Sequence, residues 1–432
     1  DDLHAPKGVI MQAQNLAAQA FGADHTFFSV QGTSGAIMTM ILTVVGPGDK
    51  IIVPRNVHKS IMSAIVFAGA IPIFIHPEVD SELGISHGIS PESVERALLK
   101  YPDAKAVLVI NPTYFGFVAD LKRIVDIVHA RNIPVIVDEA HGVHIKFHDD
   151  LPLSAMQAGA DMAATSTHKL GGSMTGSSVL NVKEGLVSAK RVQSVFSMLT
   201  TTSTSYPMLA SIDTARRQLA VHGQTLLDDA IHLAKDARKR INSIPHLHCV
   251  GREKLGTSAT YDMDPLKLLI SVKDLGITGH VAEEWLRVNA NIEIELSDLY
   301  NILCLVTIGD TKKEVNLLIN ALIRMSKTFE SDASITETNV QIPEIPALAM
   351  SPRDAFYAQT ESIPLALSEG YICAEFIMVY PPGIPIFIPG EIITQSNIDF
   401  IKMNVEAGLP VQGPEDSTLQ NIRVIKERKA IY

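Results

Sequence analysis

The chain has 432 residues, of which 46% are hydrophobic and 19% are charged, and its net charge is −11. This length exceeds one ordinary core, so we expect two or three domains in a globular protein. The acidic balance argues against a protein that binds nucleic acid or an anionic membrane, because such binding needs a basic face. It is compatible with a small cationic substrate. No apolar run approaches the roughly twenty residues that span a bilayer.

The three cysteines are widely spaced, at Cys249, Cys304 and Cys373, and form no CxxC or Cys/His cluster. A disulfide framework and a zinc site are therefore not expected. We interpret the cysteines as buried free thiols in a reducing cytoplasm. No signal peptide is recognisable, and the chain opens with Asp1 rather than Met. This start predicts that residues are missing upstream.

From about residue 25 to residue 185, short β-branched runs alternate with longer stretches of helical period. The expected strands lie at 25–30, 51–54, 72–76, 106–110, 134–137, 162–164 and 177–182. Expected helices between them lie at 60–68, 91–100 and 121–129. The alternation predicts an α/β fold with a mostly parallel sheet and helices on both faces. Ligands bind such sheets at the carboxyl ends of the strands.

A domain boundary is predicted between about residues 200 and 230. We expect a large domain over 1–220, a smaller α+β domain over 221–330 and a C-terminal domain over 345–432. The smaller domain should contain strands near 268–272, 292–297 and 303–308 and a helix near 312–326. The polar stretch 328–344 is typical of a linker.

The segment 30–36, which reads VQGTSGA, joins a predicted strand to a predicted helix. Small residues there let backbone N–H groups and hydroxyls at a helix N-terminus surround a phosphate. The same composition is typical of an ordinary turn and helix cap. This segment alone leaves both interpretations open.

The segment 135–144, VIVDEAHGVH, places Asp138 directly after a buried apolar strand. Burying a carboxylate there is costly unless a cation meets it. A protonated pyridine nitrogen, a metal or an arginine would each serve. His141 and His144 suggest a metal with Asp138 as third ligand, but further ligands are not evident elsewhere, so we expect no metal.

The segment 165–172, TSTHKLGG, contains Lys169. It follows Asp138 by one strand–helix–strand unit, so both side chains should point into one cleft at the carboxyl edge of the sheet. A solvated loop lysine is the commoner fate of any lysine. A lysine that forms an imine instead needs a pKa lowered by partial desolvation and nearby cations.

Two further segments carry candidate groups. The segment 54–60, PRNVHKS, passes from a strand to a helix, and His58 either starts the helix or lies flat on a cofactor ring. The run 200–206, TTTSTSY, is either an exposed loop or a source of uncharged donors to a phosphate. Together the five segments supply a phosphate cradle, a ring-stacking histidine, a pyridine-directed aspartate and an imine lysine.

The order and wording of these segments resemble the Orn/Lys/Arg decarboxylase family of fold-type I enzymes, which use pyridoxal 5′-phosphate (PLP). The likeness covers nearly the whole chain and is carried by QGTSGA, PRNVHKS, NPTYFG, VDEAHGVH, STHKLGGSMT, TTTSTSY and VYPPGIPIFIPGE. DEAHGVH and STHKLGG together are highly specific. SDLYNILC and GLPVQGPEDSTL are closest to the shorter bacterial arginine decarboxylases within the family.

The resemblance implies that Lys169 forms the imine with PLP, Asp138 keeps the pyridine nitrogen protonated and His58 stacks on the ring. Ala140 would pack on the opposite face, and His141 would lie near O3′ or the substrate carboxylate. The implied phosphate-binding residues are Thr33, Ser34, Gly35, Ser166 and His168. A hydroxyl of the 201–205 run, such as that of Thr202 or Ser203, would reach the neighbouring subunit's phosphate. The active site would then belong to a homodimer or a higher even oligomer.

The implied activity is PLP-dependent decarboxylation of a basic amino acid, with L-arginine, which gives agmatine and CO₂ for polyamine synthesis, favoured over lysine and ornithine. The cationic end of the substrate should meet a carboxylate, for which Glu361, Glu375 and Asp298 are candidates; a bidentate carboxylate favours a guanidinium. An aminotransferase or lyase of the same fold is an alternative, although it would usually need an arginine for the α-carboxylate. A non-enzymatic PLP sensor is disfavoured by the acidic charge.

Two positions depart from the family pattern. Gly176 stands where SMTQ is usual, so a side-chain amide is absent and the active-site wall would be looser. Tyr371 stands in a segment that commonly reads Gly-Arg-Ile, which puts in doubt any role of that arginine.

Overall fold

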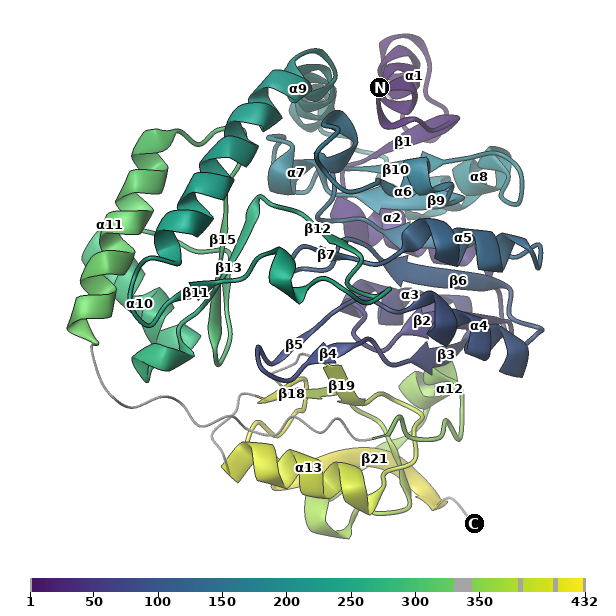
Figure 1. The fold of residues 1–432 in the computed structure, drawn as a ribbon. Helices are drawn as coiled ribbons and strands as arrows, with labels where there is room; N and C mark the ends of the chain where they lie inside the picture. Colours follow the sequence, from purple (N-terminus) through teal and green to yellow (C-terminus); the bar gives the residue numbers. More distant parts are fainter. Residues whose placement is uncertain (1, 330–343, 380–383, 407–410, 430–432) are drawn as a thin grey trace.

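The computed structural model describes residues 2–329, 344–379, 384–406 and 411–429 (Figure 1). Its large N-terminal part is built on a seven-stranded sheet of order β1-β10-β9-β8-β6-β2-β3. The strands are β1 (His25–Ser29), β2 (Lys50–Pro54), β3 (Ile71–Ile75), β6 (Ala106–Ile110), β8 (Val135–Asp138), β9 (Met162–Thr165) and β10 (Ser178–Val182). Each end lies within one residue of its predicted position, so the predicted strands are confirmed.

The direction of the strands decides where the site can form. Strand β10 runs antiparallel to both of its neighbours, β1 and β9, whereas the remaining pairings in the sheet are parallel. All strands of the sheet except β10 therefore point the same way. Their carboxyl ends meet at one edge, where ligands bind in sheets of this kind.

Helices cover both faces of the sheet, as predicted. Alternate residues of a strand enter different hydrophobic clusters: Ile51 and Val53 pack with the helices on one face, and Ile52 packs with those on the other. The first face carries α2 (Gly32–Val44), α3 (Lys59–Ala68) and α8 (Ala189–Leu199), and the second carries α4 (Pro91–Lys100), α5 (Leu121–His129) and α6 (Ala155–Ala158). Because both faces are buried, the strands are apolar along their length.

The long helix α9 (Tyr206–Ile241) leads from the large sheet to a second, four-stranded sheet of order β11-β13-β15-β14. The domain boundary predicted at residue 220 falls inside α9, and the division into domains stays a prediction. The remaining elements of this region are β11 (His248–Cys249), β12 (Asp262–Met263), β13 (Lys267–Ser271), α10 (Gly279–Ala290), β14 (Leu296–Ser297), β15 (Asn301–Leu305) and α11 (Lys312–Thr328).

The strand predicted at 292–297 is shorter than expected. Only Leu296 and Ser297 pair with β15. Ile292 and Ile294 instead pack against the hydrophobic cluster under α10 and α11. The isoleucines alternate with glutamates because their side chains are buried, not because the segment is hydrogen-bonded as a strand. A sequence pattern cannot distinguish alternating burial from strand pairing.

The C-terminal part forms two small three-stranded sheets, β16-β21-β17 and β19-β18-β20. Its elements are α12 (Pro352–Tyr357), β16 (Thr360–Pro364), β17 (Tyr371–Cys373), β18 (Ile377–Val379), β19 (Ile384–Phe387), α13 (Gln395–Glu406), β20 (Val411–Gln412) and β21 (Asn421–Lys429). Most of the predicted linker 328–344 lies outside the described residues. Smaller elements elsewhere are α1 (Gly8–Phe21), β4 (Val79–Asp80), β5 (Ile85–Ser86), β7 (Phe117–Val118), α7 (Thr167–Leu170) and four short 3₁₀ turns.

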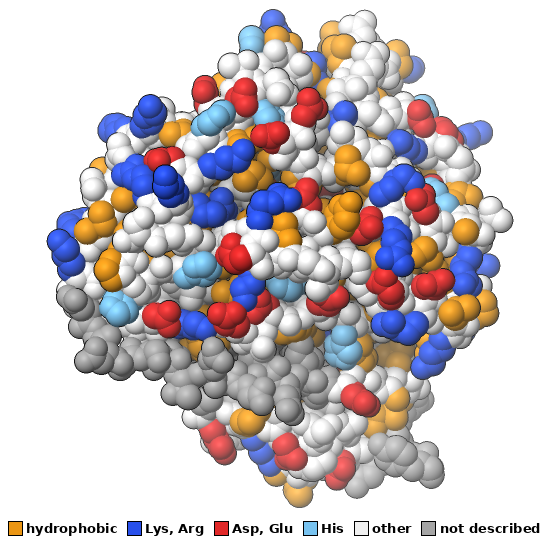
Figure 2. Space-filling model, viewed as in Figure 1, with side chains coloured by type: hydrophobic (Ala, Val, Ile, Leu, Met, Phe, Trp, Pro, Cys, Tyr) orange, Lys and Arg blue, Asp and Glu red, His pale blue; other side chains and the backbone are white. Residues whose placement is uncertain are grey.

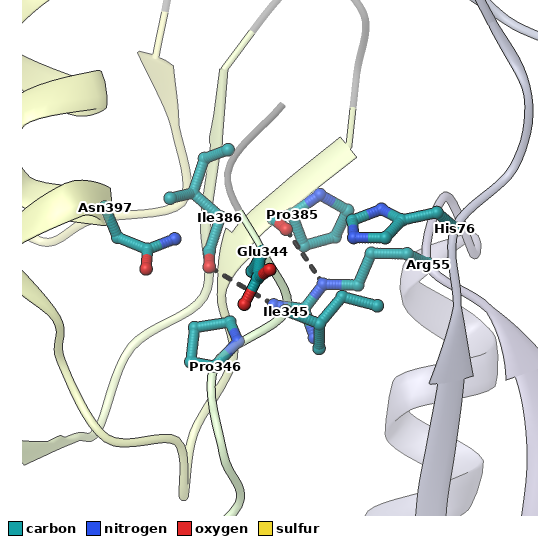
Figure 3. A pocket seen from close by; sticks show the side chains of 8 residues that line it. All are labelled: Arg55, His76, Glu344, Ile345, Pro346, Pro385, Ile386 and Asn397. Carbon is teal, nitrogen blue, oxygen red and sulfur yellow. Dashed lines mark hydrogen bonds between the residues drawn. The ribbon is translucent and has the colours of Figure 1, made fainter. Parts of the chain in front are cut away.

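A buried ion pair joins the large sheet to the C-terminal part. Figure 3 shows Arg55, which follows β2, reaching the carbonyl groups of Pro385 and Ile386, at 2.9 and 3.2 Å. Its guanidinium also donates two hydrogen bonds to Glu391, at 2.6 and 2.8 Å. Both charged side chains are only 1% exposed.

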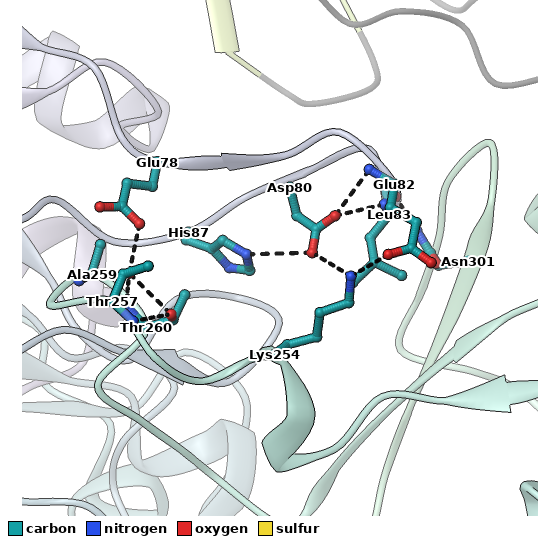
Figure 4. A network of polar contacts seen from close by, with 10 residues as sticks. All are labelled: Glu78, Asp80, Glu82, Leu83, His87, Lys254, Thr257, Ala259, Thr260 and Asn301. Atoms are coloured by element: carbon teal, nitrogen blue, oxygen red, sulfur yellow. Dashed lines mark hydrogen bonds and ion pairs between the residues drawn. The ribbon is translucent and has the colours of Figure 1, made fainter.

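A polar network joins the β4–β5 hairpin to the second region (Figure 4). Lys254 lies 3.0 Å from Asp80 and also pairs with Glu82. Asn301 donates to the carbonyl of Leu83 at 2.7 Å. The Arg55 pair therefore joins the large N-terminal part to the C-terminal part, and the Lys254 network joins it to the region that follows α9.

Several further findings bear on the predictions. None of the described helices is both long and apolar enough to cross a membrane. The three cysteines are buried and free. Basic and acidic side chains are scattered among one another over the face of the molecule in Figure 2.

Candidate active site

Four of the predicted segments converge at the carboxyl edge of the sheet. Asp138 ends β8, Lys169 lies in the short α7 directly after β9, and His58 lies between β2 and α3. The charge of Lys169 lowers the pKa values of both His58 and Asp138, although burial is the larger influence on each. Thr33, in the first turn of α2, bonds the hydroxyl of Ser166. The topology therefore brings these groups together.

Lys169 is open to solvent on one side and in contact with protein on the other. Its Nζ lies 2.8 Å from Nε2 of His141 and 5.7 Å from the centre of the Tyr114 ring. Burial lowers the pKa of the Lys169 amine, while the carboxylates of Asp138 and Glu295 act in the opposite sense. A lysine with a lowered pKa and an accessible amine is suited to react with a carbonyl group.

Asp138 is a buried carboxyl group, and it has no cationic partner in direct contact within the part of the chain that the structure describes. Its Oδ1 accepts a hydrogen bond from the backbone N–H of Ala140 at 3.2 Å, and its side chain is 5% exposed. Burial raises the pKa of Asp138 to about 6. A protonated pyridine nitrogen would supply the missing charge and donor, so this residue fits the cofactor that the family resemblance implies.

The neighbouring Glu139 points elsewhere and has a structural role. Its carboxyl group accepts from the backbone N–H of Ala155 at 2.6 Å and from the hydroxyl of Thr165 at 3.2 Å. Burial raises its pKa to about 8. Glu139 thus anchors α6 to β9, and Asp138 is the acid that faces the site.

The start of α2 has the features of a phosphate cradle. The N-cap residue Gln31 makes no side-chain hydrogen bond to this helix, so backbone N–H groups after Gly32 in its first turn can bind an anion. The hydroxyls of Thr33 and Ser166 meet there, and Ser34 is partly exposed beside them. A side chain at Gly35 would approach Cβ of Gln31 to 3.2 Å, so the backbone is close-packed at this turn.

His168 and Gly176 make hydrogen bonds next to the start of α2. Nδ1 of His168 lies 2.7 Å from the carbonyl oxygen of Ser177. The carbonyl of Gly176 accepts from the N–H of Gly32 at 2.6 Å, and Gly176 has a φ of 90°. Glycine adopts that conformation without strain. The departure from the family pattern at Gly176 therefore coincides with a turn that connects the α7 loop to α2.

The structure shows His58 in the first of the two positions that the sequence left open, at the start of α3, and stacking on a cofactor ring stays a prediction. Its Nδ1 accepts from the backbone N–H of Ser60 at 3.2 Å, so it caps α3. The residue is exposed. Burial of one side, followed by the charges of Lys169 and Lys59, lowers the pKa of His58. A neutral ring that is held at one nitrogen is suited to stacking on a planar cofactor.

Thr202 and Ser203 are exposed in the loop between α8 and α9. The backbone N–H of Ser203 donates to the hydroxyl of Thr201 at 3.2 Å, a contact within the loop itself. That a hydroxyl of this run reaches the phosphate of a neighbouring subunit stays a prediction.

The three carboxylates that we predicted to bind the cationic end of the substrate have neighbours other than Lys169. Glu361 is exposed on β16. Glu375 is buried and accepts from the backbone N–H groups of Glu415, at 2.6 Å, and Arg423. Asp298 accepts from the backbone of Tyr300 and Asn301, at 2.8 and 2.7 Å. The structure does not bring them into contact with Lys169.

Three other residues, which the sequence analysis did not single out, surround Lys169 and His141. The ring of Tyr114 lies 4.3 Å from the ring of His141, centre to centre, and its phenol donates to Glu295 at 2.7 Å. Lys267, at the start of β13, places its Nζ 2.9 Å from Nδ1 of His141. A lysine that opens an otherwise apolar strand was the available signal for Lys267. Tyr114 lies within the NPTYFG motif.

His144 belongs to a separate buried pair with Asp264, 2.9 Å away. Among residues 2–329, 344–379, 384–406 and 411–429, no group of three or more His, Cys, Asp or Glu side chains is arranged to hold a metal ion.

Comparison with known proteins identifies the family. The family model for the major domain of Orn/Lys/Arg decarboxylases matches residues 1–314, and that for the C-terminal domain matches 335–415. An arginine decarboxylase of Bacillus anthracis is 67% identical over 432 residues, which are 100% of this chain and 88% of that protein.

Solved structures show the same fold. The lysine decarboxylase LdcF of Francisella novicida superposes with a TM-score of 0.83 at 23% identity, over 98% of this chain and 73% of that one. A ureidoglycine–glyoxylate aminotransferase of Bacillus subtilis superposes with a TM-score of 0.61 at 15% identity, over 78% and 91% of the two chains. The chain therefore belongs to the Orn/Lys/Arg decarboxylase family, with the α/β architecture of fold-type I enzymes.

Proposed function

We propose that this protein is a PLP-dependent decarboxylase that converts L-arginine to agmatine and CO₂. The observation that carries the proposal is the placement, at one sheet edge, of Lys169, whose pKa is lowered by burial, near Asp138, whose buried carboxyl group makes no ion pair among the described residues. The identity of 67% to an arginine decarboxylase over the whole chain supports arginine as the substrate.

Each polar group of the site has a role in this proposal. PLP, when bound, supplies a ring that takes up the electron pair left as CO₂ departs. Asp138 would hold the pyridine nitrogen protonated by its charge in a shielded site. Lys169 would bind the cofactor through its amine and return a proton, His58 and Ala140 would enclose the ring, and the start of α2 would hold the phosphate.

Glu295 is the carboxylate that we assign to the guanidinium of the substrate. It is exposed, and its charge acts on both Lys169 and Lys267, so it lies within electrostatic reach of the reactive amine. Tyr114 connects Lys169 to Glu295. The centre of its ring is 5.7 Å from Lys169 Nζ, and its phenol donates a hydrogen bond to Glu295.

Lysine decarboxylation is the second candidate, because the fold is shared with lysine decarboxylases. A carboxylate held at one oxygen by a phenol can present the other oxygen to a guanidinium or to an ammonium. Arginine is preferred for its planar donors, which match a carboxylate edge.

The experiment that tests the function compares CO₂ release from arginine, lysine and ornithine by the PLP-loaded enzyme. We expect arginine to be turned over fastest, and Lys169→Ala to abolish turnover while the fold is retained. Preferred turnover of lysine would contradict the substrate assignment. Inactivity on all three with the cofactor bound, or CO₂ release by the Lys169→Ala variant, would contradict the decarboxylase assignment.

The proposal includes an even-numbered assembly in the cytoplasm with shared active sites. The free thiols agree with a reducing compartment. The exposed hydroxyls of Thr202 and Ser203 are available to a second copy. A hybrid of a Lys169→Ala chain with a Thr202→Val/Ser203→Ala chain should regain activity that neither parent has, because one of its two sites would be intact. No regain would refute shared sites.

A further inference from the structure

Lys267 is a lysine of the second sheet whose side chain is buried beside His141. It begins β13 and is 1% exposed. Its Nζ donates to the carbonyl oxygen of Tyr114 at 2.9 Å and lies 2.9 Å from Nδ1 of His141. A lysine is seldom buried this deeply unless its amine is bonded. The proposed reaction gives this amine no role of its own.

The stem of Lys267 lies in a slot that a glycine makes possible. A Cβ at Gly116 would lie 3.0 Å from both Cβ and Cγ of Lys267 and 3.2 Å from its Cδ, which is tighter than most side-chain contacts. Gly116 follows Tyr114 by two residues in the NPTYFG motif. The same short turn therefore makes room for the stem and accepts a hydrogen bond from the amine.

The backbone around Lys267 is held on two sides. Arg238, on α9, donates to the carbonyl oxygen of Lys267 at 2.8 Å. Asp264, three residues before Lys267, places its Oδ2 2.9 Å from Nε2 of His144, and both side chains are at most 1% exposed. His144 follows His141 by three residues, so the turn before β13 and the loop after β8 are joined at two points.

His141 has a neighbour on each side of its ring. Nδ1 faces Lys267, Nε2 lies 2.8 Å from Nζ of Lys169, and the ring centre is 4.3 Å from that of Tyr114. The two nitrogen contacts are compatible with the ring hydrogen on either nitrogen. His141 is 6% exposed, so water has little access to replace a lost partner. Without Lys267, Nδ1 would be buried unpaired, and a ring that turned to find a new partner would take Nε2 away from Lys169.

We propose that Lys267 is a positioning residue that acts through His141: it holds the ring so that Nε2 stays within hydrogen-bond distance of the amine of Lys169. The inference rests on the proposed function, in which Lys169 binds the cofactor and returns a proton. The ring of His141 is the link between the two lysines. A residue of the second sheet thereby fixes the surroundings of an amine at the edge of the first.

Crystal structures of the full chain, without cofactor or substrate, test the position of the ring. In the wild type we expect both nitrogen contacts of His141. Lys267→Met keeps most of the stem and removes the amine. In this variant the ring should turn, and Nε2 should move beyond hydrogen-bond distance of Lys169. A ring that keeps its wild-type position would overturn the proposal.

Steady-state kinetics of the PLP-loaded enzyme with arginine provide a second test. A displaced ring alters the surroundings of the amine and not those of the guanidinium. We therefore expect kcat of Lys267→Met to fall roughly ten- to a hundredfold, while KM stays within about twofold of the wild type. A raised KM with an unchanged kcat would overturn the proposal, because Lys267 would then act in substrate binding.

A double-mutant cycle separates action through His141 from a general loss of structure. His141→Phe keeps an aromatic ring beside Tyr114 but has no ring nitrogen. In that background, Lys267→Met should change kcat by less than about twofold, because the contact through which it acts is already gone. Equal factors in both backgrounds would show that Lys267 acts independently of His141, and would overturn the proposal. Where His141→Phe is inactive, the crystal structures decide.

Leu269→Ala is the matched control for lost stability. Leu269 lies two residues along β13, is 1% exposed and packs in a hydrophobic cluster with Met263 and Leu303. The control should lower the thermal midpoint and leave the ring position and kcat unchanged. A fall in kcat equal to that of Lys267→Met would overturn the proposal, because lost stability would then explain both.

Lys267→Gln decides the question where the Met variant fails to fold. Its amide keeps a polar group in the slot but ends one bond short of the lysine nitrogen, so the same displacement of the ring is expected. The crystal structures need neither PLP nor arginine. An unmoved ring therefore leaves the decarboxylase proposal standing, and an enzyme inactive on arginine, lysine and ornithine leaves the position of the ring to decide this inference.

Discussion

Replacing Glu295 with glutamine is the most direct probe of substrate recognition at this site. The amide keeps the size of the side chain and an oxygen that can accept from the Tyr114 phenol, now 2.7 Å away. What it removes is the negative charge that would face the guanidinium. A hydrogen bond to a charged group contributes about 1.5–3 kcal/mol, which corresponds to a loss of roughly ten- to a hundredfold in kcat/KM for arginine.

The loss should fall mainly on KM, because the guanidinium does not take part in the bond changes and is bound equally before and during the reaction. The assay is steady-state CO₂ release over a range of arginine concentrations. Glu293→Gln is the matched control: Glu293 is exposed two residues earlier and pairs with Arg287 at 2.9 Å. Exposed ion pairs contribute little, so this variant should have the KM and kcat of the wild type.

The reasoning would be refuted if Glu295→Gln kept the wild-type KM for arginine. An equal effect of the Glu293 substitution would also refute it, because the effect would then be one of general surface charge.

Two further predictions concern stability and pH. Arg55→Met leaves the buried Glu391 without its cation, which should cost about 3–5 kcal/mol of the free energy of unfolding and lower the thermal midpoint in calorimetry. Lys50→Met removes an exposed ion pair with Asp103 and should change the midpoint little. Similar losses in both variants would contradict a large contribution from the buried pair. Asp138 has a pKa of about 6 in the folded chain and 3.8 as its ordinary value, so without cofactor its contribution to the free energy of unfolding should decline as pH rises from about 4 to 6. Asp138→Asn should remove that decline in denaturation curves, and PLP should stabilise the wild type more than the variant; parallel pH profiles would speak against the assignment.

The sequence by itself predicted the strands of a mostly parallel sheet and the residues that follow them at its carboxyl edge. Asp138 and Lys169 each follow a strand whose apolar run identifies it, and strands joined by helical crossovers run parallel. Their carboxyl ends must then meet, so two residues far apart in the chain could be placed at one edge of the sheet by local pattern. The glycine- and hydroxyl-rich start of α2 followed from the same reasoning, because the first N–H groups of any helix lack partners within the helix.

Only the tertiary structure decided what surrounds Lys169. Lys267 opens a strand of a different sheet, and its contact with His141 depends on how that sheet packs beside the first. Glu375 and Asp298 resemble substrate carboxylates in sequence, yet backbone N–H groups of neighbouring or distant segments occupy them, and Glu295 lies by the site instead. The packing of the regions and the backbone hydrogen bonds between segments decide which carboxylate is left to bind a substrate. Neither of these produces a periodic pattern in the sequence.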